Sequence, residues 1–391
     1  MEKKLNPNPN PNSHKRLRRH ASNLWSDLSS DIMISVFERL SFANFKRAKS
    51  VCSSWHSASR RSVLRNSQIP WLILFPEGNN NACTLFNPEE KDKLYKTQDL
   101  GVVFAKSVCR ATFGSWLLMQ DPRYNLYMVN IFTKDRINLP PMESQLGSIK
   151  IERTKDDELR IISNKGYGYE SKRFNIPSFV LWIDVKTKDF IVLWGLGEFC
   201  VVYSKKGDTS WSQIPKSSDC YQMVYKDHKL YSSRYYGYSF KIFDFSADTP
   251  REAFHDDTYH TRYRRLRGGA KFVVTVSGDV LRVERMFSES GILSFIIYKV
   301  YSSLGFLKDH EEVDSLGDEA MLLDLGITVL ASDIEGIKPN CIYFTGYRGR
   351  NTTDISLYNI ETQKMELLRK FDCSSAQFSR ARWFLPSFVG T

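Results

Sequence analysis

The residues best suited to chemistry form one group at positions 255–260. There His255 and His260 flank Asp256 and Asp257, and imidazole and carboxylate groups are common metal ligands. The Thr, Tyr and Arg residues around them favour an exposed loop over a metal site. We therefore treat this group as a metal candidate that its context does not support.

Adjacent carboxylates also occur at 156–157 and 311–312, in polar sequence typical of loops. Acid–base catalysis needs two groups placed around a reacting atom, and neighbouring loop positions do not predict that arrangement. The sequence contains no His-Glu-x-x-His, Walker loop, GxSxG or EF-hand pattern. We expect no catalytic residue, no metal and no cofactor.

Two basic runs could contact phosphate or carboxylate groups. Residues 262–269 read RYRRLRGG, and cations with an aromatic neighbour can bind nucleic acid. No recognition fold accompanies this run, so we favour an inter-strand loop. Residues 14–19 form a candidate nuclear-import cluster, with a solvated basic tail as the alternative; its cations are Lys15, Arg16, Arg18 and Arg19.

The composition bounds the class of protein. The 391 residues suffice for two or three domains, and an aromatic content of 13% favours strands. The sequence shows neither a long apolar run nor the apolar segment of a secretory signal, so we expect no membrane association. The seven Cys include no CxxC pair, which predicts free thiols and a nuclear or cytoplasmic location.

The net charge of +11 is concentrated near the N-terminus. Residues 14–66 contain eleven Lys and Arg against three acids, a net charge of +8. A basic face of this kind can meet either nucleic acid or an acidic protein. Both classes of partner stay open on charge alone.

Three regions follow one another along the chain. Residues 1–22 form a basic tail, because the PNPNPNP repeat supports neither helix nor strand pairing. Residues 23–66 predict three short helices, the first running from near Asp31 to about Arg39. A unit this short cannot bury a full core alone, so we expect it to dock on another protein. The expected apolar positions are Ile32, Val36, Phe37 and Leu40, then Phe42, Phe45 and Ala48, then Val51, Cys52, Trp55, Ala58 and Val63.

From residue 70 to 391 the hydrophobic period changes to two, and no long helical pattern interrupts it. Short strands separated by Gly, Pro, Asn and Asp predict an all-β domain. The predicted strands are 71–75, 115–120, 126–132, 179–185, 190–194, 199–203, 221–225, 240–245, 272–276, 292–300, 341–345 and 355–360.

An internal repeat strengthens this prediction. The segments LYMVNIFTKDR, LWIDVKTKDF and SLYNIETQKM each place Thr three residues after an Asx residue, at Asn130, Asp184 and Asn359. Such side chains hydrogen-bond the local backbone and stabilise hairpin turns. With looser copies the steps are 43, 54, 60, 55 and 60 residues, which favours propeller blades with long loops. A pair of irregular β-sandwiches is the alternative.

The helical region carries a family resemblance through a specific combination of residues: Trp25, Ser26, Leu28, Asp31, Ile32, Val36, Phe37, Leu40, Phe45, Arg47, Val51, Cys52 and Trp55. They resemble the F-box, which docks on the Skp adaptor of Skp–cullin–F-box (SCF) ubiquitin ligases. The resemblance implies that this set, apart from Ser26 and Asp31, binds the adaptor. Two positions depart from the pattern. Ser29 replaces the usual Pro, which we expect to weaken adaptor binding by about 1 kcal/mol, and Asn44 stands where Asp is common.

The β region carries a second resemblance in residues 317–346, which include Lys338-Pro339-Asn340-Cys341, and in the closing WFLPS at 383–387. It resembles the kelch- or propeller-like C-terminal domain of a large plant F-box family, catalogued as domain of unknown function 295. Asp324 and Leu330-Ala331 loosen the match. The expected fold is therefore α+β and multidomain: a three-helix F-box followed by an all-β, propeller-like repeat domain.

Together the resemblances imply a non-enzymatic substrate receptor. Its partners would be a Skp-type adaptor, through it a cullin, and a target protein that the sequence does not name. Catalysis would be proximity of target lysines to a charged conjugating enzyme. An alternative is a nuclear nucleic-acid-associated protein that uses the basic tail and residues 262–269. A third is a β-propeller enzyme, which no sequence feature favours.

Overall fold

The structure is a computed structural model, in two units formed by residues 1–67 and 68–391. It describes the chain except for residues 1–24, 26–27, 41, 62–70, 77–80, 88–93, 148, 164–175, 185, 197–198, 219, 235–238, 257–269, 288–292, 305–310, 334–336, 346–354, 370–377 and 385–391. The predicted tail cluster at 15–19, the basic run at 262–269 and Val63 lie outside the described residues. No helix in the described part is long and apolar enough to span a membrane.

The first unit contains the three predicted helices: α1 (Ser30–Phe37), α2 (Phe42–Lys49) and α3 (Ser53–Arg61). Their small core consists of Met33, Phe37, Phe45, Ala48 and Ala58. The sequence pattern placed Ile32, Val36, Phe37 and Leu40 on the apolar face of α1. Phe37 is buried and Leu40 packs against the core as predicted, but Met33 is buried in place of Ile32, which stays 53% exposed. A three-helix unit has room for one stripe per helix, and the larger Phe37 ring takes it.

Among the described residues, the second unit consists of strands together with the short helix α4 (Val102–Ala105) and the 3-10 turns η1 (Met142–Ser144) and η3 (Ala331–Asp333). The first sheet has the order β27-β1-β2-β3 and the second the order β4-β5-β6-β7. Their strands are β1 (Trp71–Pro76), β2 (Thr84–Phe86), β3 (Leu94–Lys96), β4 (Val108–Phe113), β5 (Trp116–Gln120), β6 (Leu126–Asn130), β7 (Arg136–Asn138) and β27 (Phe378–Phe384).

Two further four-stranded sheets follow, with a separate hairpin before them. The hairpin is β8 (Ile149–Arg153) and β9 (Leu159–Ser163). The sheets are β10 (Ser178–Ile183), β11 (Phe190–Gly195), β12 (Val201–Lys205) and β13 (Ser212–Gln213), then β14 (Gln222–Lys226), β15 (Lys229–Ser233), β16 (Phe240–Asp244) and β17 (Arg251–Asp256).

A nine-stranded sheet divides into two groups joined by the single parallel pair Val274 and Ile327. The first group is β18 (Ala270–Val274), β19 (Val280–Phe287), β20 (Leu293–Tyr301) and β21 (Glu311–Glu312). The second is β22 (Glu319–Leu322), β23 (Ile327–Leu330), β24 (Cys341–Thr345), β25 (Ile355–Asn359) and β26 (Lys364–Arg369). Each of the twelve predicted strands overlaps an observed strand.

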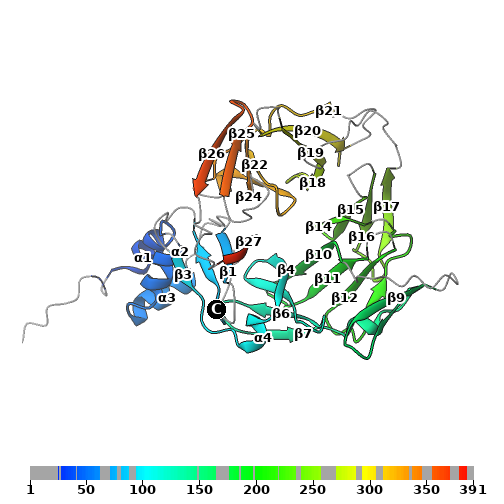
Figure 1. Cartoon of the computed structure of the whole chain (residues 1–391). Helices are drawn as coiled ribbons and strands as arrows, with labels where there is room; N and C mark the ends of the chain where they lie inside the picture. Colours follow the sequence, from blue (N-terminus) through cyan, green and yellow to red (C-terminus); the bar gives the residue numbers. More distant parts are fainter. Residues whose placement is uncertain are drawn as a thin grey trace, which may run out of the picture. The chain divides into compact units, whose positions relative to one another are not determined.

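The sheets pack face to face in sequence order, as Figure 1 shows from β4 to β26. Trp116 and Trp194 share a core between the second and third sheets, and Val201 and Phe243 share one between the third and fourth. Central strands therefore have neighbours on both faces, which is why all of β5 and β11 are buried. Packing against two neighbouring sheets favours the predicted propeller over a pair of sandwiches.

The last strand closes this arrangement. β27 pairs antiparallel with β1, from Trp71 opposite Phe384 to Pro76 opposite Phe378. Leu72 and Trp383 of this sheet then pack against Ile355 of β25. On its other side β27 contacts β4. The first sheet thus depends on both ends of the β domain.

The inner strands of neighbouring sheets run in the same direction. Near the starts of β10 and β14, Ser178 Oγ accepts a hydrogen bond from Met223 N (3.2 Å). Near the ends of β4 and β27, Thr112 Oγ1 donates to Trp383 O (2.9 Å). The domain therefore has two distinct ends. We name them the entry end, where β4, β10, β14 and β18 begin, and the turn end, where they finish.

The predicted Asx turn is present at Asn130. Its Oδ1 accepts hydrogen bonds from the backbone N–H groups of Phe132 (2.9 Å) and Thr133 (3.1 Å). Asp135 N donates to Thr133 Oγ1 (3.3 Å). The fifth residue, Lys134, has φ +65°, so the side-chain bonds hold a left-handed turn at a non-glycine residue.

Related side-chain bonds occur in the other two close copies. Asp184 Oδ1 accepts from Thr187 N (3.0 Å) and Lys186 N (2.7 Å), and these bonds lower the pKa of the Asp184 carboxyl. Asn359 Oδ1 accepts from Thr362 N (2.8 Å) and Oγ1 (3.0 Å). The repeat is thus a repeated backbone geometry, with a specific role for each polar side chain.

The copies are not equivalent in their sheets. Asn130 and Asn359 follow β6 and β25, the next-to-outermost strands, whereas Asp184 follows the inner strand β10. The repeat therefore does not mark one fixed position in every blade. In an antiparallel sheet, hairpins after the first and third strands emerge on the same side. All three turns accordingly lie at the turn end.

Substitution tests the turn. We expect Asn130→Ala to lower the free energy of unfolding by about 1 kcal/mol, because two backbone N–H groups lose their acceptor. Asn130→Asp keeps the acceptor oxygen and should stay close to wild type. Denaturant unfolding of the full chain measures both, and equal stability of all three proteins would contradict the assignment.

Removal of β27 tests closure. A chain that ends at residue 377 leaves β1 with an open edge and removes Trp383 from its core. We expect it to lose the cooperative unfolding transition and to aggregate. A matched change, Phe384→Leu, keeps the strand and an apolar side chain, and should unfold cooperatively. A cooperative transition in the shortened chain would show that the β domain does not need this pairing.

Candidate functional site

The first unit contains the set of residues that the sequence assigned to adaptor binding. Helix α1 begins after Ser29, whose φ of −58° and ψ of 145° are extended. Ser29 Oγ accepts a hydrogen bond from Ile32 N at 3.5 Å, so this residue caps the helix. The serine that departs from the family pattern therefore replaces the fixed φ of proline with a side-chain cap.

Aromatic contacts hold the core. The Phe37 ring meets Phe45 at 5.5 Å and Trp55 at 5.4 Å between ring centroids, in each case edge to face. Trp55 is only half-buried, and its outer side meets Trp25 at 6.4 Å. Its indole Nε1 donates to Trp25 O (2.9 Å). Trp55 thus links the core to the surface.

Three residues of the predicted set are largely exposed although they are apolar. The exposed fractions are 68% for Trp25, 53% for Ile32 and 61% for Val51. Large apolar side chains of this kind gain free energy when another protein covers them. We name Trp25, Ile32 and Val51 the exposed apolar set.

The other predicted residues divide between core and surface. Phe37 and Phe45 are buried, Leu28 and Leu40 pack against the core, and Val36 and Cys52 are half-buried. Sequence reasoning missed Met33, which is buried. Its spacing of four from Phe37 was the available signal.

The second departure from the family pattern also has a structural role. Arg47 is exposed, and its Nη1 donates to Asn44 Oδ1 (3.2 Å). An Asp at this position would accept the same bond. Asn44 therefore keeps Arg47 oriented while removing one negative charge beside it.

Cys52 lies just before α3. Its Sγ is 3.1 Å from Ser54 Oγ, and hydrogen bonds from the Ser54 hydroxyl and the Trp55 backbone N–H lower the pKa of the thiol. The thiol joins the loop to the first turn of the helix. Cys52 therefore has a hydrogen-bonding role at a position that is only half-buried.

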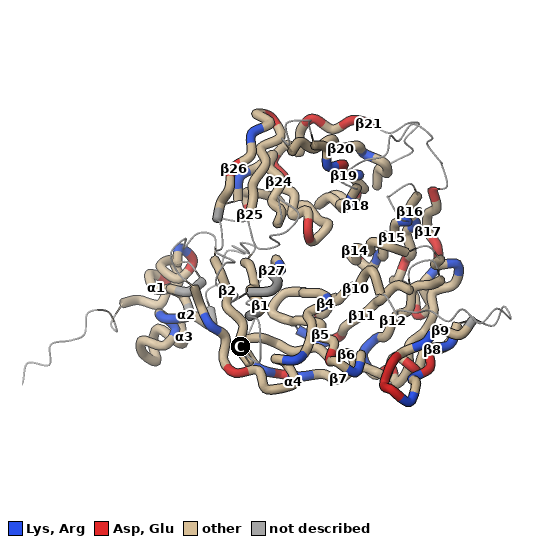
Figure 2. The backbone as a smooth tube through the Cα atoms, viewed as in Figure 1, with Lys and Arg blue, Asp and Glu red and all other residues tan. Residues whose placement is uncertain are grey.

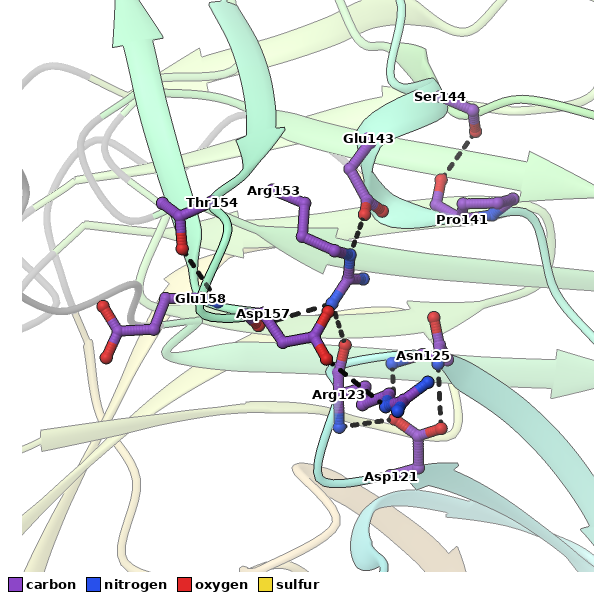
Figure 3. Close-up of polar contacts among 10 residues, drawn as sticks. All are labelled: Asp121, Arg123, Asn125, Pro141, Glu143, Ser144, Arg153, Thr154, Asp157 and Glu158. Carbon is purple, nitrogen blue, oxygen red and sulfur yellow. Dashed lines mark hydrogen bonds and ion pairs between the residues drawn. The ribbon is translucent and has the colours of Figure 1, made fainter.

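The β domain contains a polar cluster at the hairpin β8–β9, drawn in Figure 3. Arg153 forms an ion pair with Glu143 and donates to Arg123 O (2.7 Å), and Arg123 lies 3.4 Å from Asp157. Asp121 accepts hydrogen bonds from the backbone N–H groups of the same turn. These pairs attach the hairpin to the β5–β6 turn, so Asp157 serves a structural contact.

The other candidates for chemistry remain separate. His255 Nδ1 lies 3.9 Å from Glu252 Oε1, and His260 lies outside the described residues. Glu311 and Glu312 form a short exposed strand. Within the described part of the chain, no group of three or more metal-ligating side chains converges.

Comparison with known families resolves the two units. The F-box domain matches residues 25–67, and the KIB1-4 β-propeller matches residues 85–359. The chain belongs to the F-box proteins that carry a KIB1-4 β-propeller. The mostly-β domain thus has the propeller-like fold that the sequence predicted.

Relatives agree over the whole length. The Arabidopsis thaliana protein At4g22180, named as an F-box protein, is 56% identical over 99% of this chain and 99% of its own. The F-box protein At1g69090 of the same plant is 42% identical and covers 93% of this chain and 92% of its own. Among solved structures, a Lactobacillus plantarum protein aligns with a TM-score of 0.40 at 10% identity, over 80% of this chain and 99% of its own.

Ser29 can be tested by two substitutions. We expect Ser29→Ala to destabilise α1 by about 0.5–1 kcal/mol, because the cap bond is lost. Ser29→Pro should restore most of this, because a φ of −58° suits the proline ring. Hydrogen exchange of the amides of residues 31–37 in the full chain reports on α1. Equal protection in all three proteins would show that Ser29 does not cap the helix.

Proposed function

We propose that this protein is the substrate-recognition subunit of an SCF ubiquitin ligase. The F-box binds a Skp-type adaptor, the adaptor joins a cullin, and the β-propeller holds a target protein. The exposed apolar set carries this proposal: Trp25, Ile32 and Val51 stay in water although the F-box has a core of its own. Family membership supports the same assignment.

The energetics favour docking. A large apolar side chain that passes from exposed to buried contributes about 1.5–3 kcal/mol before the costs of association. Three such side chains offset a substantial part of those costs. The exposed cation Arg47 lies on the same unit and adds attraction to an acidic adaptor, which raises the association rate more than the affinity.

The β-propeller has a different task. Its sheets form a rigid support, and the connections at its two ends offer surfaces for a target. A receptor of this kind accelerates ubiquitin transfer by holding target lysines close to the charged conjugating enzyme. The covalent chemistry then belongs to that enzyme, and the receptor contributes only position.

Surface substitutions separate docking from folding. We expect Ile32→Asp combined with Val51→Asp to reduce co-purification with the Skp-type adaptor at least about tenfold, because two desolvated apolar contacts become charged. The unfolding transition should stay unchanged, since both residues are exposed. Leu304→Asp, which alters a side chain that is 94% exposed in the β domain, is the matched control.

Core substitutions make the comparison sharper. Leu28→Ala combined with Trp55→Ala should also abolish adaptor capture, but by disrupting the helical core, while the β domain remains folded. Normal capture by the Ile32 and Val51 double variant would contradict the proposed docking surface. Affinity purification with the ligase inactivated then identifies the target that the propeller holds.

A further inference from the structure

We propose that Ser50 is phosphorylated by a Ser/Thr protein kinase that selects basic sequences, and that the phosphate blocks adaptor docking. The inference deepens the proposed function and rests on it, since it states how the exposed apolar set is regulated. It adds a modified residue, a class of modifying enzyme and the direction of the effect.

Ser50 lies at an accessible point between two helices. It follows α2 directly and precedes Val51 of the exposed apolar set. Its side chain is exposed, and its Oγ donates a hydrogen bond to Arg47 O (2.8 Å). Because α2 has only eight residues, its end opens at a low cost in free energy, which lets a kinase bind the segment in an extended form.

The residues before Ser50 carry a pattern of positive charge. The cations stand four, three and one residues before it, at Lys46, Arg47 and Lys49. Between Glu38 and Glu77 the sequence contains no acidic residue, and the tube of α2 in Figure 2 carries no red position. Kinases distinguish substrates by the charges beside the acceptor residue, so this pattern selects a kinase whose peptide-binding groove is acidic.

Asn44 leaves one of these cations uncompensated. Its Oδ1 accepts a hydrogen bond from Arg47 Nη1 (3.2 Å), which orients the guanidinium without neutralising it. An Asp at this position would place a negative charge beside Arg47. The Arg47 guanidinium is therefore able to pair with a kinase carboxylate before the reaction and with the phosphate on Ser50 after it, across three residues of helix.

The modification is a phosphoryl transfer from ATP, which the kinase binds. The Ser50 oxygen attacks the γ-phosphorus, and the bond from that phosphorus to the bridging oxygen of ADP breaks. A catalytic Asp of the kinase accepts the hydroxyl proton. The hydrogen bond to Arg47 O is lost, because the modified Ser50 oxygen has no proton to donate.

The phosphate changes the docking surface while the F-box keeps its fold. It adds a charge of about −2 at pH 7 directly before Val51. The end of α2 repels this charge, whereas the start of α3 at Ser53 attracts it, so the effects of the two helix ends oppose one another. An acidic adaptor that covers Val51 meets a charge of its own sign, and Arg47 pairs with the phosphate instead of the adaptor.

Ser57 provides a matched comparison. It is exposed like Ser50 and lies within α3. The four residues before it contain neither Lys nor Arg. The same kinase should therefore leave Ser57 unmodified.

Site-resolved phosphorylation of the full chain tests the assignment. The probe is the catalytic subunit of cyclic-AMP-dependent protein kinase with ATP. Mass spectrometry measures the occupancy of each serine, because Ser22 also follows cations. We expect phosphate on Ser50, and Lys46→Gln with Arg47→Gln should slow its addition at least about tenfold, because the kinase loses its charged contacts. An unmodified Ser50 in wild type would overturn the inference.

Adaptor capture tests the consequence. Wild type and Ser50→Ala are both treated with kinase and ATP, so they share every other phosphate. We expect treated wild type to capture about tenfold less Skp-type adaptor than treated Ser50→Ala, because only wild type carries the charge before Val51. Phosphatase should restore capture, and Ser57→Ala should behave as wild type. Equal capture by treated wild type and treated Ser50→Ala would overturn the inference.

Two further measurements separate the possible causes of lost capture. Denaturant unfolding of the treated wild type should match that of untreated protein, and a lost transition would show that the phosphate unfolds the F-box instead of blocking its surface. Untreated wild type that captures no adaptor contradicts the proposed function. Normal capture by untreated wild type that persists with phosphate on Ser50 contradicts only the regulatory role of this residue.

Discussion

The pairing of β27 with β1 is the constraint on which the β domain depends. Neighbouring sheets bury their faces against one another, so the first and last sheets need one another as much as the central ones do. The strand that joins them comes from the end of the chain, at Phe378–Phe384, and pairs with Trp71–Pro76. Bringing two strands this far apart in the chain together costs loop-closure entropy. The apolar surface buried between the sheets offsets that cost. Within each hairpin, Asn130 and Asn359 stabilise the turn through hydrogen bonds to the local backbone.

The F-box is too small to bury all of its apolar side chains. Its core is small, and the Phe37 ring fills it through edge-to-face contacts with Phe45 and Trp55. Little apolar surface can be hidden by three short helices, so Trp25, Ile32 and Val51 remain in water. A unit that is stable enough to hold its shape yet leaves apolar side chains outside is suited to a partner that covers them. The β domain, by contrast, packs large apolar cores between its sheets.

The sequence predicted an element correctly where a single pattern was strong, such as an uninterrupted run of apolar residues. The strand predicted at 190–194 is apolar throughout, and the structure has a strand there, inside a sheet. The sequence did not predict β19. β19 contains the buried ion pair of Arg282 and Glu284. Because both residues are charged, the sequence of this strand resembles that of a solvent-exposed segment. Met33 was missed for a related reason: Ile32 and Met33 are both apolar, and the choice of buried stripe depends on α2 and α3. The residues predicted to bind the adaptor all belong to the first unit, but the sequence pattern could not divide them into core and surface.

By itself the sequence determined the order of the units, the type of each major element and the turn chemistry of Asn130, Asp184 and Asn359. These depend on local periodicity and on side chains that bond their own backbone, so neighbouring residues suffice. Tertiary structure alone decided that β27 closes the first sheet and that Ile32 faces water. Both features depend on residues far apart in the chain, because the packing that decides them exists only after folding.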